Sequence, residues 1–454
     1  MNARTNVPSW ARRLSLGAVS LGAIAVAALF APSREANAFP PPPPTHPGDP
    51  LPGLSTTLRS LFDDGKTLFQ HELTPEEGLG PIYNQKACQT CHGSLGGTPG
   101  GSDVLGVGST NDVTHIGFDN RGYYDPLRYL GGPLLEVNSI HDDGVPGCPL
   151  LGETVPSKAN IISHRHTPPV LGFGLIDAIP DDEIRAYENL GIDGIHGFAN
   201  WGVEMQALDT EPTPFFPPIP VYGAPRVGRF GWKAQTATLA QFSAEPFNTE
   251  LGATTPFFPQ EHSPVGVRTP AALPAGCEVA TTNPNDVDAS RAYALYHFQA
   301  LLAPPPRLPP TPKSILGETL FFAFGCQNCH RAEMVTASEY DLTLDGVTSV
   351  RVPELENQVV HLYSDLLVHD MGPVLADDGG ANVGRVMTRA RGNHWRTTPL
   401  WGLRLKDAYL HDGRTTSIEE AILAHGGEAT VVRNRFAASS DTERALLVEF
   451  LQTL

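Results

Sequence analysis

The sequence predicts a mainly α chain made of two related domains that follow an N-terminal leader. The first basis is a five-residue pattern, Cys-x-x-Cys-His, which occurs at 88–92 and again at 326–330. The second basis is the similarity of the stretches around the two copies, which indicates an internal duplication. The 43 prolines and 45 glycines among 454 residues predict long loops between the helices.

The histidine that ends each pattern decides among the chemistries open to two cysteines three residues apart. A dithiol couple or half of a zinc site would need only the cysteines. Two thioether bonds to a haem, with the next residue as an axial iron ligand, use the histidine as well. A zinc site is a lesser alternative, because the two cysteine pairs lie in different halves of the chain. A dithiol site is another, because no β-α-β pattern is visible near either pair. The sequence therefore predicts two cytochrome c-like haem domains with covalently bound haem c, held by Cys88, Cys91, His92, Cys326, Cys329 and His330.

The first 38 residues have the features of a cleaved signal peptide. Arg12 and Arg13 precede an apolar run at 14–30, and two small residues, Ala36 and Ala38, stand where a signal peptidase reads. We expect cleavage after Ala38 and a periplasmic or otherwise exported protein, because haem c is attached outside the cytoplasm. An uncleaved membrane anchor is the alternative, although 14–30 is at the short limit for a span.

Proline-rich stretches divide the rest of the chain. Residues 39–53 are typical of a stiff, extended linker. A second proline-rich break at 303–312 follows a stretch with a helical pattern. We therefore expect the first haem domain at 54–285 and the second at 286–454.

Two cysteines, Cys148 and Cys277, lie outside the haem motifs. In an oxidising compartment they are expected to form a disulfide. Two separate buried thiols are the alternative.

The net charge of −18 limits the partners of the chain. It argues against nucleic acid and against an anionic membrane surface as binding partners. It fits a cationic electron-transfer protein, such as a small soluble cytochrome c or copper protein. An acidic exported protein without such a partner would have the same charge. No stable membrane span is expected after the leader.

The similar stretches keep one order in both halves. GKTLF and GETLF precede the motifs, TPPVLG and TTPLWG follow them, and a Gly-Arg pair then precedes a helical pattern. The matched ranges are 65–69 with 317–321, 167–172 with 397–402, and 228–247 with 413–425.

The last of these stretches brings a histidine to an apolar helix face. Ser417 and Glu420 form a capping-box pattern at the start of the helix, and Gly426 ends it. The apolar residues recur at i, i+3 and i+4, and His425 takes position i+7. A histidine on such a face is normally a core residue, but beside a haem it can bind the iron. We expect His425 to be the distal ligand of the second haem, with Met371 as its rival.

Alignment of the two helices leaves the first haem without that ligand. When Leu239 is set against Ile418, Pro246 takes the position of His425. An iron that lacks a sixth protein ligand can bind a small oxidant. If the two helices align in another register, or if another loop supplies a histidine, the first haem iron could still have a sixth ligand. The candidates are His115, His141, His164 and His166.

Polar residues lie in or just after the first of these helices, namely Gln241, Glu245 and Glu250. Carboxyl and amide groups near an open iron can handle protons. The solvent-facing side of a helix would have the same composition. Trp232 and Trp401 could carry electrons near the haems, although most tryptophans are core residues.

Together these features resemble the di-haem c-type oxidoreductase family, which is related to bacterial di-haem cytochrome c peroxidases. The stretches that carry the resemblance cover most of 60–430 and include EEGLGPIYNQKACQTCHG, TPPVLGFGLIDAIPDDEI and YLHDGRTTSIEEAILAHGG. The resemblance implies that the first haem is the peroxide site and that the second passes electrons to it. It also implies catalytic roles for Trp232, Gln241 and Glu250, and a calcium ion between the haems.

The sequence departs from the family in two places. Relatives have a Met or a Tyr at the position of His425, so the resemblance implies a bis-histidine haem of lower potential here. The F-W-D-G-R stretch typical of the peroxidases is absent, and GFGLIDAIPDD stands in its neighbourhood. We expect an exported, peroxidase-like di-haem oxidoreductase. A non-catalytic di-haem electron-transfer cytochrome and a haem-based sensor are the alternatives.

Overall fold

The structure is a computed structural model, and it describes residues 46–92, 112–120, 123–127, 130–206, 221–259, 273–277, 286–377, 390–406 and 408–454. These residues belong to the unit formed by Asn37–Leu454. The expected signal peptide and residues 39–45 of the expected linker lie outside them. None of the helices described is both long and apolar enough to cross a membrane.

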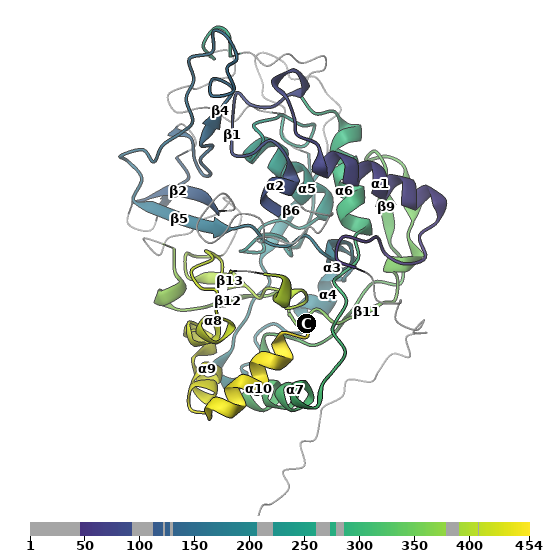
Figure 1. Cartoon of the computed structure of the whole chain (residues 1–454), viewed down its shortest axis with the longest axis vertical. Helices are drawn as coiled ribbons and strands as arrows, with labels where there is room; N and C mark the ends of the chain where they lie inside the picture. The colour runs from purple at the N-terminus through teal and green to yellow at the C-terminus, as the bar shows by residue number, and fades with distance from the viewer. Residues whose placement is uncertain are drawn as a thin grey trace, which may run out of the picture. The chain divides into compact units, whose positions relative to one another are not determined.

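Within these residues the chain forms both helices and short strands (Figure 1). The α-helices are α1 (Thr56–Gln70), α2 (Cys88–His92), α3 (Phe173–Asp177), α4 (Asp181–Arg185), α5 (Leu239–Thr249), α6 (Ala289–Leu301), α7 (Pro312–Phe324), α8 (Ile418–Leu423), α9 (Thr430–Ala437) and α10 (Asp441–Leu451). The strands are β1 (Ile82–Tyr83), β2 (Asp112–Asn120), β3 (Tyr123–Asp125), β4 (Asn138–Ser139), β5 (Ile161–His166), β6 (Trp201–Gln206), β7 (Val221–Val227), β8 (Met334–Val335), β9 (Asp341–Thr343), β10 (Ser349–Arg351), β11 (Val359–Val360), β12 (Val368–Asp370) and β13 (His394–Arg396). The helices are the longer elements, but the many short strands make the fold less strongly α than the sequence predicted.

The sheets of the described part are small and antiparallel. One has three strands in the order β3-β2-β5, and the others are pairs. β5 ends directly before the TPPVLG stretch, and β13, which pairs with β12, ends directly before the TTPLWG stretch. The two sheets therefore occupy the same place relative to the similar stretches.

α1 and α6 cross closely because a glycine stands where they meet. A Cβ on Gly65 of α1 would lie 2.0 Å from the carbonyl oxygen of Ala294 in α6 and 2.7 Å from the Cβ of Phe298. Only glycine permits so close an approach of the two backbones. The ring of Phe298 packs on Phe69, four residues after the glycine, at a centroid separation of 5.0 Å.

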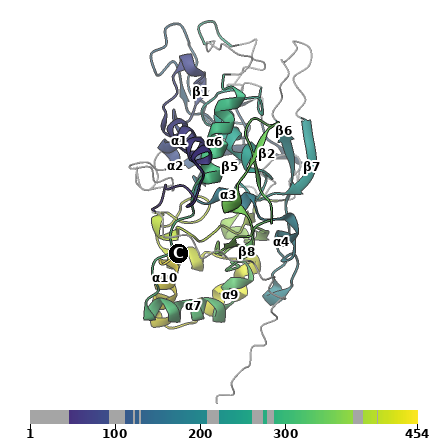
Figure 2. The same cartoon turned by 90° about the vertical axis from the view of Figure 1, so that its right-hand side faces the viewer.

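α7 and α10 repeat this crossing with the same distances. A Cβ on Gly317 of α7 would lie 2.0 Å from the carbonyl oxygen of Leu446 in α10 and 2.7 Å from the Cβ of Phe450. The ring of Phe450 packs on Phe321, again four residues after the glycine, at 5.4 Å. Figures 1 and 2 show α1 beside α6 and α7 beside α10. The GKTLF and GETLF stretches thus play the same part in two helix pairs.

The TPPVLG and TTPLWG stretches also end alike. Gly172 and Gly402 both have φ of 71°, in the left-handed region that favours glycine. Gly172 leads into α3, and Gly402 leads into a 3₁₀ turn at Leu403–Leu405. The same backbone bend therefore follows each strand pair.

A third recurrence sets the register of α5 against α8. An isolated bridge joins Phe230 to Thr236, and a second joins Tyr409 to Thr415. Each loop has two residues with positive φ in the same places, Gly231 (78°) and Ala234 (50°) in the first and Leu410 (73°) and Gly413 (65°) in the second. The loops end at the capping residues of the two helices, Thr238 for α5 and Ser417 for α8.

This recurrence corrects one part of the sequence alignment. The Gly-Arg pair at 228–229 precedes its loop, whereas the pair at 413–414 lies inside the second loop. The two pairs are therefore not equivalent. Counted from the capping residues, however, Leu239 does match Ile418, and Pro246 does match His425.

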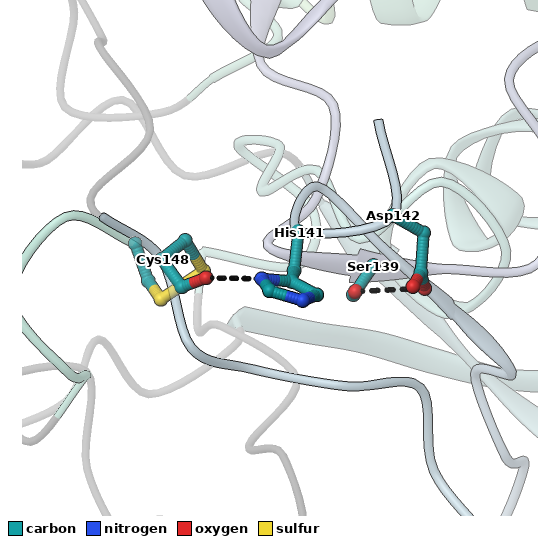
Figure 3. The surroundings of a disulfide bond; sticks show 5 residues. Ser139, His141, Asp142 and Cys148 are labelled. Carbon is teal, nitrogen blue, oxygen red and sulfur yellow. Dashed lines mark hydrogen bonds between the residues drawn. A yellow bond between two sulfur atoms is a disulfide. The ribbon is translucent and has the colours of Figure 1, made fainter. Parts of the chain in front are cut away.

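The expected disulfide joins Cys148 and Cys277, with an S–S distance of 2.10 Å (Figure 3). Both cysteines are buried. The Nδ1 nitrogen of His141 donates to the carbonyl oxygen of Cys148 at 2.6 Å. In the same loop the hydroxyl of Ser139 donates to Asp142 at 2.9 Å. The disulfide thus belongs to a hydrogen-bonded loop of the first half of the chain.

Candidate functional site

The second Cys-x-x-Cys-His motif lines an apolar cavity. α7 ends at Gly325, whose φ of 94° turns the chain into a 3₁₀ turn at Cys326–Asn328. Cys326 packs beside a hydrophobic cluster that includes Phe321 and Phe450. Residues that line the cavity include Cys326, Cys329, His330, His369, Met371 and His425.

His330 has one ring nitrogen occupied and the other left over. Its Nδ1 donates to the carbonyl oxygen of Tyr363 at 3.0 Å. Burial first, and then the nearby His425, lower the pKa of His330 to about 4. The ring is therefore neutral, with the proton on Nδ1 and the lone pair of Nε2 available to a metal.

His425 has the same arrangement within its own helix. Its Nδ1 donates to the carbonyl oxygen of Ala421 at 2.7 Å. Burial lowers the pKa of His425, so this ring is neutral as well. The structure brings His330, His425 and the rival Met371 to one cavity.

The start of α8 differs from the predicted capping box in one bond. Ser417 caps the helix, since its hydroxyl accepts from the backbone N–H of Glu420 at 3.3 Å. The carboxylate of Glu420 accepts from the hydroxyl of Thr415 at 2.5 Å rather than closing the box. The helix thus begins where expected, and Glu420 ties it to the preceding loop.

The first motif presents its histidine in the same way. α2 carries the motif, and the Nδ1 of His92 donates to the carbonyl oxygen of Pro168 at 3.0 Å. Burial lowers the pKa of His92 to about 4. Phe69 of α1 packs against its ring at 6.0 Å. His92, His330 and His425 therefore each hold Nδ1 on a backbone carbonyl and leave Nε2 for another partner.

The motif cysteines are half-buried, in surroundings that favour the neutral thiol in both halves. Burial raises the pKa of Cys88 to about 12 and the pKa of Cys326 to about 12. Burial also raises the pKa of Cys91 and of Cys329. A redox-active dithiol needs a lowered thiol pKa, so this environment disfavours the dithiol alternative.

Glu250 lies near Cys91 of the first motif, within a group of polar residues that the sequence did not reveal. It follows α5 directly, and its Oε2 accepts from the side-chain amide of Asn84 at 2.9 Å. Its charge helps to raise the pKa of Cys91. Burial first, and then the charge of Glu250, raises the pKa of Glu136 well above the usual value. Asn84 and Glu136 lie outside the helices, where no periodic pattern marks them.

The other predicted residues of this site lie in different places. Gln241 is buried in the first turn of α5. Glu245 accepts from the hydroxyl of Thr236 at 3.4 Å. Trp232 lines the cavity of the second motif, and its indole N–H donates to the carbonyl oxygen of His166 at 2.9 Å. The sequence grouped Trp232 with the first haem, whereas the structure places it on the wall of the second cavity.

Trp232 also belongs to a reciprocal contact between the two halves. The backbone N–H of Arg396 donates to the carbonyl oxygen of Trp232 at 2.9 Å, and that of His166 donates to the carbonyl oxygen of His411 at 2.7 Å. Trp232 and His411 hold the same place in the two recurrent loops, while His166 and Arg396 end the two equivalent strands. The rings of Trp232 and His411 meet edge to face at 6.5 Å. Equivalent residues thus meet one another, as they do across a two-fold axis.

The four histidines that could close the first haem are dispersed. His141 is bonded to Cys148 in the disulfide loop. Burial lowers the pKa of His115 to about 3. His164 contacts Thr114. His166 takes part in the reciprocal contact, and none of these placements assigns a ligand.

One cluster of potential metal ligands in the described part of the chain consists of Cys329, Asp365 and His369. The ring of His369 lies between two carboxylates, with Nε2 3.0 Å from Asp365 and Nδ1 3.0 Å from Glu428. Burial acts to lower the pKa of His369, but Asp365 and Glu428 raise it well above the usual value. A protonated imidazole cannot bind a cation, and calcium requires oxygen ligands. This cluster therefore does not fit the expected calcium ion.

A family model agrees with the expectation of a di-haem oxidoreductase. A family model described as "Di-haem oxidoreductase, putative peroxidase" matches residues 133–454. The matched span includes the second motif, His425 and Glu250. The comparison with curated protein sequences gave no match.

One solved structure that matches is the hydrazine synthase of Kuenenia stuttgartiensis pressurised with 20 bar xenon. The identity is 13%, and the match covers 98% of this chain and 100% of that chain. The TM-score is 0.35, which is too low to support an argument about this chain.

Proposed function

The chain belongs to the di-haem oxidoreductase family, and on that premise we propose that it is an exported, peroxidase-like member with two covalently bound haem c groups. One observation carries the proposal. His92, His330 and His425 each give Nδ1 to a backbone carbonyl and leave Nε2 for a metal. That is the state in which histidine binds iron, and two of the three follow a Cys-x-x-Cys pair directly.

The residues fit the group that the motifs imply. Each pair of half-buried thiols could take up two haem vinyl groups as thioethers. A haem held there would supply an iron that exchanges electrons. The apolar walls around the second motif would suit a porphyrin ring, since apolar side chains exclude water.

We assign the second site to electron transfer. His330 and His425 offer two neutral imidazoles to one iron, which leaves no position for an oxidant. Trp232 and His411 lie on the contact between the halves, so they stand where electrons would pass from the second haem to the first. A small cationic redox protein is the proposed donor, because the chain carries a net charge of −18.

We assign the first site to the oxidant, which we propose is a peroxide. Pro246 of α5 occupies the position that matches His425 after α8, so α5 offers no imidazole at this position. The buried Glu136 lies near the half-buried Glu250, and burial together with the charge of Glu250 raises the pKa of Glu136 and favours its protonated form. In the proposed reaction a carboxyl of this pair gives a proton to the leaving oxygen, and Gln241 orients the substrate.

The recurrences support two related cytochrome c-like domains. Each domain would begin with the helix that precedes its motif and end with the helix that crosses this first helix. These helices are α1 and α6 in the first domain, and α7 and α10 in the second. The expected boundary at 285/286 would separate α6 from α1. We therefore place the boundary after α6, in the proline-rich stretch at 303–312.

Export rests on the leader sequence and agrees with the disulfide, which forms in oxidising compartments. The predicted cleavage after Ala38 is part of this proposal. The calcium ion between the haems is retained only as an implication of the family resemblance.

A non-catalytic di-haem cytochrome is the second candidate, because a histidine could still bind the iron of the first haem as its sixth ligand. The candidates are His115, His141, His164 and His166. Two measurements on the purified exported protein separate the candidates. Pyridine-haemochrome analysis should give two haems per chain, retained in acid–acetone. The ferric spectrum should show one high-spin and one low-spin haem, and cyanide should convert the high-spin component. Two low-spin haems without cyanide binding would support the cytochrome and reject the enzyme.

A further inference from the structure

Three cationic side chains line the cavity of the second motif without a described carboxylate partner. Two of them interact with each other, namely Arg396, the last residue of β13, and Lys406, which follows the 3₁₀ turn at Leu403–Leu405. The third, Arg433, has polar partners for two of its nitrogens, the carbonyl oxygen of Leu423 and the side chain of Asn434. His369, which also lines the cavity, is paired with Asp365 and Glu428.

Arg396 is 8% exposed and has only carbonyl partners. Its Nε donates to the carbonyl oxygen of Gly231 at 2.9 Å, and its Nη1 lies 3.4 Å from the carbonyl oxygen of Thr397. Within the described residues it makes no ion pair. Burial alone lowers its pKa to about 10, without an opposing carboxylate. The guanidinium thus keeps its charge and has donors left over.

The backbone of Lys406 forms hydrogen bonds, while its side-chain ammonium has no described partner. Its N–H donates to the carbonyl oxygen of Leu403 at 3.3 Å, and its carbonyl oxygen accepts from the hydroxyl of Tyr409 at 3.4 Å. Burial first, and then repulsion from Arg396, lowers its pKa to about 8. The two cations are therefore close enough to repel each other across an apolar cavity.

Uncompensated cations in a cavity wall are unfavourable, because a charge leaves water at a high cost unless it is paired. At Arg396, which is buried, and Lys406, which is half-buried, the described chain supplies two neighbouring positive charges and no carboxylate partner. A haem carries two propionate carboxylates, so it would bring two anions to these two cations. The number and sign of the charges match, and arginine suits a carboxylate through two parallel hydrogen bonds.

We propose that Arg396 and Lys406 bind the propionates of the second haem. This inference rests on the proposed function, since it assumes a haem between His330 and His425. It adds which residues orient the ring and neutralise its charge. A positive charge beside a haem favours the reduced iron, so these residues also raise the potential of the second haem.

The test uses the exported holoprotein with Arg396→Met and Lys406→Met, each of which removes one cation and keeps an apolar chain. Both variants should lower the midpoint potential of the low-spin haem in a spectroelectrochemical titration. They should also shift the propionate-bending bands of its resonance Raman spectrum. Arg396→Lys, which keeps the charge, should restore most of the potential but not the Raman band.

Arg404→Met is the matched control. Arg404 lies two residues before Lys406, but its guanidinium bonds to the carbonyl oxygens of Leu454 and Pro306 and does not line the cavity. This variant should leave the potential and the Raman bands unchanged. If Arg396→Met does not accumulate, Lys406→Met decides alone, because its ammonium holds no described group.

Unchanged potential and Raman bands in Lys406→Met and Arg396→Met, with two haems per chain, would overturn the propionate assignment. A wild-type protein with no low-spin haem would instead contradict the proposed function itself. The haem count and spin state of the wild type therefore separate the two failures.

Discussion

The Nδ1 nitrogen of His425 lies 2.7 Å from the carbonyl oxygen of Ala421, four residues earlier in the chain. Because the acceptor belongs to α8, the helix itself sets the orientation of the imidazole. The bond also places the proton on Nδ1, so Nε2 carries a lone pair. The capping bond from Ser417 to the backbone of Glu420 fixes where this helix begins, and hence where His425 stands.

Glu250→Gln should slow peroxide turnover while leaving both haem spectra nearly unchanged. The substitution keeps the shape of the side chain and removes its ability to transfer a proton. A positioned proton-transfer group contributes roughly 10²–10⁴-fold to a rate, and a loss in that range is expected in a steady-state peroxide assay. Glu245→Gln, one turn earlier on α5 and bonded to Thr236, is the matched control and should retain its rate. Equal rates for the wild type and Glu250→Gln would remove Glu250 from the catalytic group.

Glu136→Gln should make the protein less sensitive to rising pH. Burial and the charge of Glu250 raise the pKa of Glu136 well above 4.5. Between the ordinary pKa of a glutamate and the raised pKa of Glu136, the unfolded chain releases the proton while the folded chain keeps it. Within that pH range this residue lowers the free energy of unfolding as pH rises. Glutamine stays neutral in both states and removes this loss. Urea unfolding at about pH 5 and about pH 8 should show the variant gaining stability relative to the wild type at the higher pH. An equal pH dependence in both proteins would contradict the assignment.

Gly65→Ala and Gly317→Ala should each destabilise the fold through the helix crossings. The new methyl group would stand 2.0 Å from a carbonyl oxygen of the facing helix in both cases. Overpacking of this kind costs about 1–3 kcal/mol, although alanine is the better helix former by about 1 kcal/mol. Asp64→Ala, on the exposed side of α1, is the control and should change the free energy of unfolding by less than about 0.5 kcal/mol. A stabilised Gly65→Ala variant would show that α1 and α6 do not approach as described.

The double variant Cys148→Ala, Cys277→Ala should lose stability. The disulfide closes a long loop, with 129 residues between its ends in sequence. Loss of such a bridge typically costs about 2–4 kcal/mol. Thermal unfolding of the two proteins measures the change, and non-reducing peptide mapping of the wild type should recover the cross-linked pair. Two alkylatable thiols in the unfolded, unreduced wild type would refute the disulfide.

Features carried by local patterns were predictable from the sequence. The start of α8 follows from Ser417, and its register against α5 follows from the apolar spacing. The short strands were not predictable, because two or three residues such as Val359–Val360 show no alternation. The alignment of the two Gly-Arg pairs was wrong, because the two loops have positive φ at matching positions but have different residues there.

Contacts between distant segments were also beyond the sequence. Asn84 reaches Glu250 across 166 residues, and no pattern marks either Asn84 or Glu136 as part of a site. Trp232 was assigned to the first haem by its order among family residues. The fold instead carries its loop to the contact between the halves, where it faces the equivalent loop around His411.

The central claim is that His330 and His425 bind one iron while the first iron is open. The most direct measurement is the electronic and electron paramagnetic resonance spectrum of ferric His425→Ala, with Met371→Leu as its control. The account predicts a new high-spin signal in His425→Ala, with the low-spin haem lost, and an unchanged spectrum in Met371→Leu. A low-spin signal that survives His425→Ala and disappears in Met371→Leu would contradict the claim and make Met371 the ligand.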